Sequence, residues 1–319
     1  MRFFLALFLA AGALGAAAQT WPSRPVRVMV GFAPGGPNDI IARAYGARLA
    51  ESLGQPFVVE NKTGAAGNLA AEAVARAAPD GYTLMLGSTG TNAVNPALYS
   101  NLAFDPVRDL APVSVVATSP SALAVHPRVQ AQSVAELIAL ARAQPGKLTY
   151  ASAGSGSSQH LSAELFKQAA GVDIVHVPYK GAAPGITDLL AGQVDMSFAP
   201  VANVVPHAKS GKLRLLAVTG AARSEFAQGV PTIAESGLPG FDVITWYAVF
   251  ATTGTPAAML ERLNAELRKI AQIPQLKEQL AGLGIDAAAS ASLAEARAYR
   301  DAEVERWGRL VRGLGVKAE

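Results

Sequence analysis

Two glycine-rich segments in this chain have the composition of loops that bind anions. Gly35 and Gly36 follow a predicted strand and precede a predicted helix, and residues 154–158 lie in the same setting further along. The start of a helix presents free backbone N–H groups and partial positive charge, and serine hydroxyls add donors. Either loop alone could equally be a tight turn that caps a helix. Two such loops facing one crevice at the ends of strands favour a site for an anion.

Other polar groups at the ends of predicted strands could complete such a site. We expect them to include Ser88, Thr89, Asn92, Tyr179, Lys180 and Gly181. Lys180 could offset the charge of a ligand or lie solvated at the rim. His160, in the first turn of the helix after the second loop, could donate to a ligand, face solvent or cap the helix. Trp246 and Tyr247 could line the crevice, although aromatic residues at such a junction are more typical of the core.

The sequence lacks the motifs of a catalytic site. It contains no Gly-x-Ser-x-Gly turn and neither of the glycine patterns that bind nucleotides. It has no cysteine, and its four histidines are far apart, without metal-ligand spacing. The net charge of +3 comes without a lysine and arginine cluster. We therefore expect no enzyme activity, no metal, no cofactor and no nucleic-acid partner.

The order of the predicted elements indicates two α/β lobes. Apolar runs alternate with segments of helical period, which is typical of mostly parallel sheets covered by helices. Residues 26–67 and 148–185 repeat one plan of strand, glycine-rich loop, helix and strand, and the same number of positions separates Gly36 from Lys62 and Gly154 from Lys180. Strands are predicted at residues 26–30, 57–59, 83–86, 113–116, 148–150, 174–177, 194–198 and 213–218, and later helices at 256–272, 274–281 and 292–314.

The first residues have the composition of a secretory signal peptide. Arg2 precedes an apolar run at residues 3–14, and Ala16 to Ala18 match a cleavage site, so we predict removal of residues 1–18. The alternative of a membrane anchor is disfavoured because the apolar run is short. An exported chain without cysteine suits a bacterial periplasm. Two crossings near residues 118–120 and 241–245 would form a hinge, with residues 19–118 and 245–319 as lobe 1 and residues 119–244 as an inserted lobe 2.

Motifs along the whole mature chain match one known family. They lie at residues 30–39 (VGFAPGGPND), 59–68, 78–84 (APDGYTL), 95–99 (NPALY), 150–161 and 176–181 (HVPYKG). Through them the sequence resembles the substrate-binding receptors of tripartite tricarboxylate transporters, the Bug or TctC-like family. The resemblance implies a periplasmic-binding-protein fold, type II-like, that closes on a small carboxylate and delivers it to transporter membrane subunits without catalysis. We expect such a receptor to be a monomer.

The resemblance also implies which residues contact the ligand. Such receptors hold a carboxylate with backbone amides, hydroxyls and ordered water in two βα loops rather than with an arginine. Carried over to this sequence, the contacts are Phe32, Ala33, Gly35, Gly36, Gly67, Asn68, Ser88, Thr89, Asn92, Ser155, Ser157, Ser158, His160, Tyr179, Lys180 and Gly181.

Two segments depart from the pattern of the family. Ala199-Pro200 stands where members often have Asp-Asn, and Lys62-Thr63-Gly64 replaces Arg-Pro-Gly. Without the acidic residue near the cleft, a ligand with an ammonium group is disfavoured, so we expect a plain mono- or dicarboxylate rather than an amino acid. Two other functions remain open from the sequence. They are a ligand-sensing module for a membrane signalling partner and a periplasmic hydrolase or isomerase on the same scaffold, the latter disfavoured because no nucleophile or base is evident.

Overall fold

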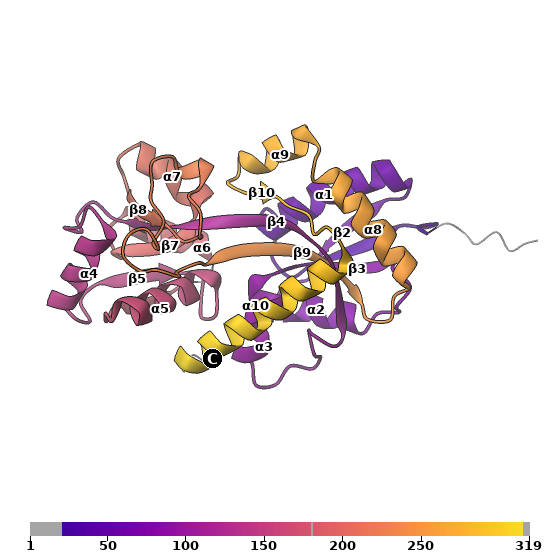
Figure 1. Cartoon of the computed structure of the whole chain (residues 1–319), viewed down its shortest axis with the longest axis horizontal. Helices are drawn as coiled ribbons and strands as arrows, with labels where there is room; N and C mark the ends of the chain where they lie inside the picture. Colours follow the sequence, from indigo (N-terminus) through magenta and orange to yellow (C-terminus); the bar gives the residue numbers. More distant parts are fainter. Residues whose placement is uncertain (1–20, 180, 315–319) are drawn as a thin grey trace, which may run out of the picture.

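The computed structural model describes residues 21–179 and 181–314. The predicted signal peptide and Lys180 lie outside these residues. The described chain forms two α/β lobes side by side, joined by two long strands (Figure 1). We call the part built on strands β1 to β3 lobe 1 and the part built on strands β5 to β8 lobe 2. The predicted α/β class with two crossing strands is confirmed.

Lobe 1 is built on a parallel three-stranded core. β1 lies between β2 and β3, and Val28 pairs with Val59 on one side and with Leu84 on the other. Its strands are β1 (Val26–Val30), β2 (Phe57–Asn61), β3 (Thr83–Ser88) and the short β10 (Asp286–Ala287). Its helical elements are α1 (Pro37–Leu53), η1 (Ala65–Gly67), α2 (Asn68–Ala75), η2 (Gly90–Val94), α3 (Asn95–Leu98), α8 (Ala257–Ile270) and α9 (Pro274–Ala281).

Lobe 2 repeats the parallel plan in its own sheet. β5 lies between β6 and β7, with Tyr150 paired to His176 and to Met196. Its strands are β5 (Thr149–Ser152), β6 (Val175–Pro178), β7 (Met196–Pro200) and β8 (Arg214–Val218). Its helical elements are α4 (Val134–Ala143), α5 (Ser158–Ala170), α6 (Ala182–Leu190), α7 (Val201–Lys209) and η3 (Glu225–Ala227). The repeated strand, loop, helix and strand plan predicted from the sequence is therefore confirmed.

The two connecting strands are much longer than the sequence indicated. β4 (Leu110–Val125) and β9 (Ile244–Thr252) run antiparallel to each other, and β4 also pairs antiparallel with β7 and β8. The sheets are thus mixed, with parallel pairs inside each lobe and antiparallel pairs along the connection. The sequence predicted a strand at residues 113–116 and a crossing near residues 118–120, and the structure joins both in β4. Pro112 and Pro120 pair with β9, and the register shifts just after Pro112.

Capping residues explain where several helices begin and end. Ser133 Oγ accepts the N–H of Glu136 at 3.2 Å, and Ser292 Oγ accepts that of Glu295 at 3.1 Å, as the Ser-x-x-Glu spacing of both segments predicts. Gly171 ends α5 in the left-handed conformation with φ of 61°, which glycine adopts without steric cost.

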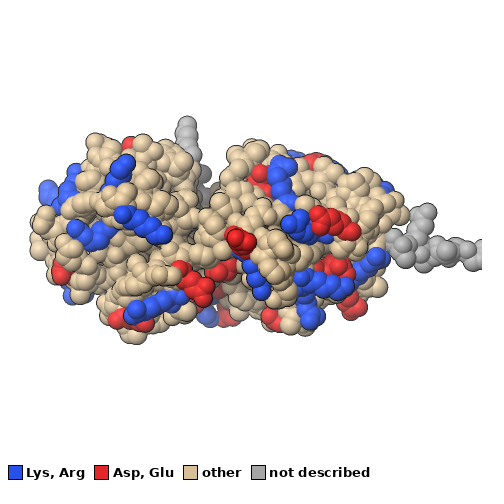
Figure 2. All heavy atoms as spheres, turned by 90° about the horizontal axis from the view of Figure 1, so that it is seen from above, with Lys and Arg blue, Asp and Glu red and all other residues tan. Residues whose placement is uncertain are grey.

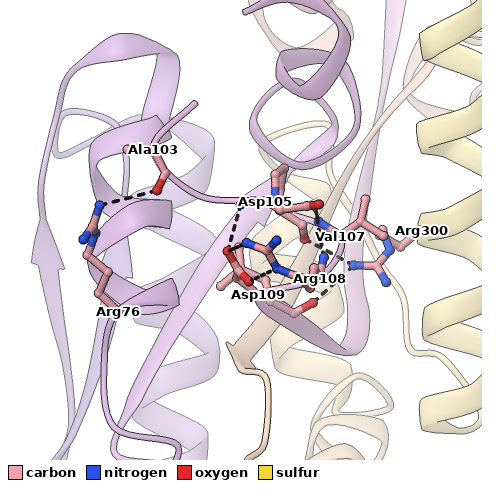
Figure 3. A network of polar contacts seen from close by, with 9 residues as sticks. Arg76, Ala103, Asp105, Val107, Arg108, Asp109 and Arg300 are labelled. Carbon is pink, nitrogen blue, oxygen red and sulfur yellow. Dashed lines mark hydrogen bonds and ion pairs between the residues drawn. The ribbon is translucent and has the colours of Figure 1, made fainter. Parts of the chain in front are cut away.

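The C-terminal helix α10 (Leu293–Leu314) crosses the molecule and packs on elements of both lobes (Figure 1). Arg300 is only 4% exposed, and its guanidinium donates to the carbonyls of Pro106 and Leu110 (Figure 3). In the same loop, Asp109 accepts from the N–H of Asp105 and pairs with Arg108. The helix thus fixes the loop from which β4 departs toward lobe 2.

Candidate ligand-binding site

The loops after the three parallel strands of lobe 1 converge at one edge of the sheet. A Cβ added to Gly31 would lie 2.5 Å from the Cα of Gly67, and one added to Gly67 would lie 2.5 Å from Thr91 Oγ1. A side chain at Gly31 would therefore require backbone movement, and one at Gly67 would displace Thr91 and strain a backbone with φ of 90°. Because the strands are parallel, their carboxyl ends meet at this edge. The predicted contacts in the loops after β1, β2 and β3 are thus brought together.

The first loop is held in place by Asp39, which the sequence reasoning did not assign to the site. The Asp39 carboxylate is only 4% exposed and accepts from the N–H of Gly35 at 3.0 Å, from Asn61 Nδ2 at 2.9 Å and from Arg43. The hydrogen bond from Arg43 lowers the pKa of Asp39 to about 2, and the bonds from Gly35 and Asn61 act in the same direction. The N–H of Gly35 is thus occupied, so Gly35 contributes its left-handed backbone, with φ of 83°, rather than a free donor.

Three buried amide groups in the converging loops lack an acceptor. Within residues 21–179 and 181–314, the Nδ2 atoms of Asn38, Asn68 and Asn92 are buried without a hydrogen-bond partner. Two of these amides already accept a hydrogen bond through their oxygen. After β2, Asn68 Oδ1 accepts from Asn95 at 2.7 Å, and after β3, Asn92 Oδ1 accepts from the N–H of Ser88 at 3.1 Å. A buried donor without an acceptor is costly, so these groups favour a ligand that supplies acceptor oxygens.

The loop after β2 contains strained backbone at the same edge of the lobe 1 sheet. Ala65 and Ala66 have φ of 46° and 51°, a conformation that L-residues rarely adopt. The carbonyl of Ala66 accepts from Thr91 Oγ1 at 3.0 Å and from Asn95 Nδ2 at 3.1 Å, which holds the strained turn. Strain of this kind clusters at ligand sites, where the surrounding structure maintains it. No pattern in the sequence predicts this strain, because alanine does not typically adopt positive φ.

In lobe 2, the loops after β5 and β6 also lie together. A Cβ added to Gly154 would lie 3.3 Å from the carbonyl oxygen of Tyr179, whose N–H donates to Ser152 at 3.0 Å. Ser157 caps α5, its hydroxyl accepting the N–H of His160 at 3.3 Å. Among the described residues, the hydroxyls of Ser88, Ser155 and Ser158 have no hydrogen-bond partner. They remain free to donate to a carboxylate.

His160 is a buried, neutral donor at the start of α5. Its Nδ1 accepts the N–H of Gly156 at 3.0 Å, and its ring stacks on that of His176 with centroids 4.1 Å apart. Burial lowers the pKa of His160 to about 4, and the proximity of His176 adds to the shift. Because Nδ1 is an acceptor, the proton of the neutral ring is on Nε2, which can donate to a ligand.

This arrangement predicts a pH dependence of folding stability that His160 causes. Its pKa is about 4 in the folded chain against 6.5 for an ordinary histidine, so the unfolded chain binds an extra proton between these values. The free energy of unfolding should therefore fall as the pH decreases from about 6.5 to about 4. Urea unfolding across this range should show a steeper fall for the wild-type chain than for His160→Gln. Parallel curves for the two proteins would contradict the assignment.

Several predicted contacts have their polar groups engaged elsewhere. Thr89 Oγ1 accepts the N–H of Trp246 at 2.8 Å, so this hydroxyl ties the third loop to β9. The hydroxyl of Tyr179 donates to Asp188 at 2.6 Å, and burial raises the pKa of Tyr179 to about 12. Trp246 is fully buried and Tyr247 is 4% exposed, so both belong to the core. Lys180 lies outside the described residues.

A separate hollow in the described part of the chain does not involve these donors. A hollow of about 740 Å³ lies between α7, η3 and the segment after α9, and its walls are both apolar and polar, with Lys209, Arg214 and Glu225 among them. None of the predicted contacts lines it. On the face shown in Figure 2, basic and acidic side chains occur on both lobes, and a notch separates the lobes. In the described ranges, no group of three or more His, Asp or Glu side chains is placed to hold a metal, and no helix has the length and apolarity to cross a membrane.

Two mixed sheets joined by crossing strands, with loops gathered at the strand ends, define the class of two-lobed α/β binding proteins. Residues 41–316 match the family model described as the tripartite tricarboxylate transporter family receptor. The chain belongs to this family of periplasmic solute-binding receptors, so the resemblance stated from the sequence motifs is confirmed.

Relatives and solved structures agree with this assignment over nearly the full chain. BugT of Bordetella pertussis is 37% identical, with 98% of this chain and 97% of that protein covered. An R. palustris protein solved with adipate is 38% identical with a TM-score of 0.84, and the match covers 93% of this chain and 99% of that one. MatC of Rhodopseudomonas palustris, solved with bound malate, is 34% identical with a TM-score of 0.80, covering 91% of this chain and 99% of that one.

Proposed function

We propose that this receptor captures a small mono- or dicarboxylate between its lobes and delivers it to the membrane subunits of a tripartite transporter. The observation that carries the proposal is the set of buried amide donors of Asn38, Asn68 and Asn92, which lack acceptors among the described residues. A carboxylate supplies such acceptors. The adipate and malate bound by two structural relatives belong to the same chemical class.

The proposed grip uses neutral donors from both lobes. Lobe 1 supplies the amides and Ser88, and lobe 2 supplies the hydroxyls of Ser155 and Ser158 and the Nε2–H of His160. A ligand that touches both lobes binds the closed state more tightly than the open state and so favours closure. We take residues 19–118 with 245–319 as one lobe and residues 119–244 as the other, with β4 and β9 as the hinge.

The proposal includes export and excludes catalysis. Residues 1–18 would be removed as a signal peptide, and the mature chain would act as a periplasmic monomer. No enzymatic step is proposed. Ser152 Oγ lies 2.6 Å from His176 Nε2, but Ser152 is only 1% exposed and its hydroxyl also donates to the carbonyl of Gly154, so this pair holds the loop after β5.

Isothermal titration calorimetry with a panel of carboxylates tests the proposal. The panel contains malate, succinate, adipate and benzoate, with glutamate and aspartate as amino-acid counterparts. We expect binding of at least one plain carboxylate and weaker binding of the amino acids, because the cleft segment Ala199-Pro200 has no acidic side chain to pair with an ammonium group. Tight binding of an amino acid alone would overturn the ligand class.

Ser157→Ala should weaken both the fold and the binding of the best ligand. Loss of the N-cap costs about 1 kcal/mol of stability, and the loop that carries Ser155 and Ser158 loses its anchor. Ser133→Ala is the matched control, because Ser133 caps α4 with the same geometry, at 3.2 Å. Denaturant unfolding should show similar losses for both variants, while calorimetry should show reduced affinity only for Ser157→Ala. If Ser157→Ala binds the ligand as tightly as Ser133→Ala does, the loop of residues 154–158 does not belong to the site.

A further inference from the structure

One contact joins the two lobes directly beside the candidate site. Leu98 is the last residue of α3 in lobe 1, and Gly156 lies in the loop between β5 and α5 of lobe 2. A Cβ on Gly156 would overlap Leu98 Cδ2, well inside the 3.0 Å below which such contacts essentially never occur. Leu98 is 5% exposed and Gly156 is buried, so the contact is tightly packed. The glycine therefore leaves room for the terminal methyl group of Leu98, which a Cβ at this position would displace.

Each partner in this contact is fixed to one half of the candidate site. Leu98 follows Asn95 by one helical turn, and the side chain of Asn95 donates to the carbonyl of Ala66 and to Asn68 Oδ1. On the other side, the N–H of Gly156 donates to His160 Nδ1. The Leu98–Gly156 contact thus connects the donors of lobe 1 to those of lobe 2 through short, rigid paths.

We propose that the Leu98–Gly156 contact is a steric stop that sets the spacing between the two half-sites and thereby selects the length of the ligand. This inference rests on the proposed function and deepens it. Packed side chains resist compression, so the bulk at this contact determines how far the lobes can close. A dicarboxylate that spans the gap at that spacing engages both lobes, whereas a shorter one leaves donors on one lobe unpaired.

Changing the bulk at the stop should move the preferred ligand length in a predictable direction. Leu98→Phe holds the lobes further apart without changing a glycine, and Leu98→Ala lets them approach. Gly156→Ala adds a clash, but it also strains the backbone because Gly156 has φ of 78°. Gly171→Ala is the matched control for that strain, since Gly171 has φ of 61° and an added Cβ meets nothing within 4 Å.

The experiment measures the affinities of linear dicarboxylates from malonate to suberate by calorimetry for the wild-type chain and each variant. The measured quantity is the affinity for the dicarboxylate one carbon longer than the preferred ligand, divided by the affinity for the one that is one carbon shorter. We expect Leu98→Phe and Gly156→Ala to raise this ratio by about tenfold, and Leu98→Ala to lower it by a similar factor. Gly171→Ala should keep the wild-type ratio, and Leu98→Ala in the Gly156→Ala background should restore it.

An unchanged length profile in Leu98→Phe and Leu98→Ala, with the wild-type chain binding a member of the series, would overturn the steric stop and leave the proposed function standing. If the wild-type chain binds none of these dicarboxylates and no other carboxylate of the wider panel, the proposed function fails and the steric stop fails with it. Should Leu98→Phe not fold, the comparison of Gly156→Ala with its double variant decides the question by the same ratio.

Discussion

Asn92→Asp should reduce the affinity for the best carboxylate ligand by at least about 100-fold. The substitution preserves the size of the side chain and the Oδ1 acceptor that holds the N–H of Ser88. It replaces the unpartnered Nδ2 donor by an oxygen that is negative when ionised. Two like charges about 4 Å apart repel by about 4 kcal/mol at an effective dielectric constant near 20, which exceeds the energy needed for a 100-fold loss.

Calorimetry at pH 8 checks this expectation, because a buried aspartate ionises only at a raised pH. Asn101→Asp is the control, since it adds the same charge at an exposed position of lobe 1. Circular dichroism should show that both variants remain folded. An affinity of Asn92→Asp within about threefold of the control would place the ligand away from the third loop.

Asp39→Ala should destabilise lobe 1 by about 3 kcal/mol and weaken ligand binding at the same time. Asp39 is buried, and its removal deprives the N–H of Gly35 of its acceptor and leaves Asn61 Nδ2 with the carbonyl of Phe32 as its remaining acceptor. Gly35 is exposed and Arg43 is about half exposed, so water can hydrate both, and the main loss is the link that Asp39 makes between the loops after β1 and β2. The freed loop from Phe32 to Gly36 would then have to be ordered again on binding.

Asp80→Ala provides the comparison for Asp39→Ala. Asp80 pairs with Arg24 and accepts the N–H of Tyr82 at 3.0 Å, but its side chain is 42% exposed, so its loss should cost only about 1 kcal/mol. Urea unfolding measures both values, and similar losses in the two variants would show that Asp39 does not anchor the loop.

Asp39 also predicts how the fold responds to acid. Its pKa of about 2 lies below the ordinary value of 3.8, so its stabilising contribution is complete above pH 4 and is lost as the pH falls toward 2. This range lies below the one assigned to His160, and the two effects can be separated. Asp39→Ala should remove the part of the acid destabilisation below pH 4 and leave the part above it.

The sequence by itself determined the features that depend on neighbouring residues. β1 was predicted at its observed bounds and so was α9, because apolar period and turn residues are local properties. The Ser-x-x-Glu spacing that predicts the caps of α4 and α10 is local in the same way. The pair of glycine-rich loops was evident as a repeated pattern, and the sequence motifs were specific enough to identify the family.

Only the tertiary structure decided how these parts meet. The residues of β4 do not show by themselves which part of the strand belongs to which lobe. That division depends on pairing with β9, β7 and β8, which are distant in the sequence. The anchoring role of Asp39 depends on Asn61 at the end of another strand, and the hydroxyl of Thr89 is engaged by Trp246. The sequence could mark Gly156 as part of an anion loop, but only packing between the lobes placed it against Leu98. Such contacts join distant segments, and their energies depend on distances that residue types alone do not specify.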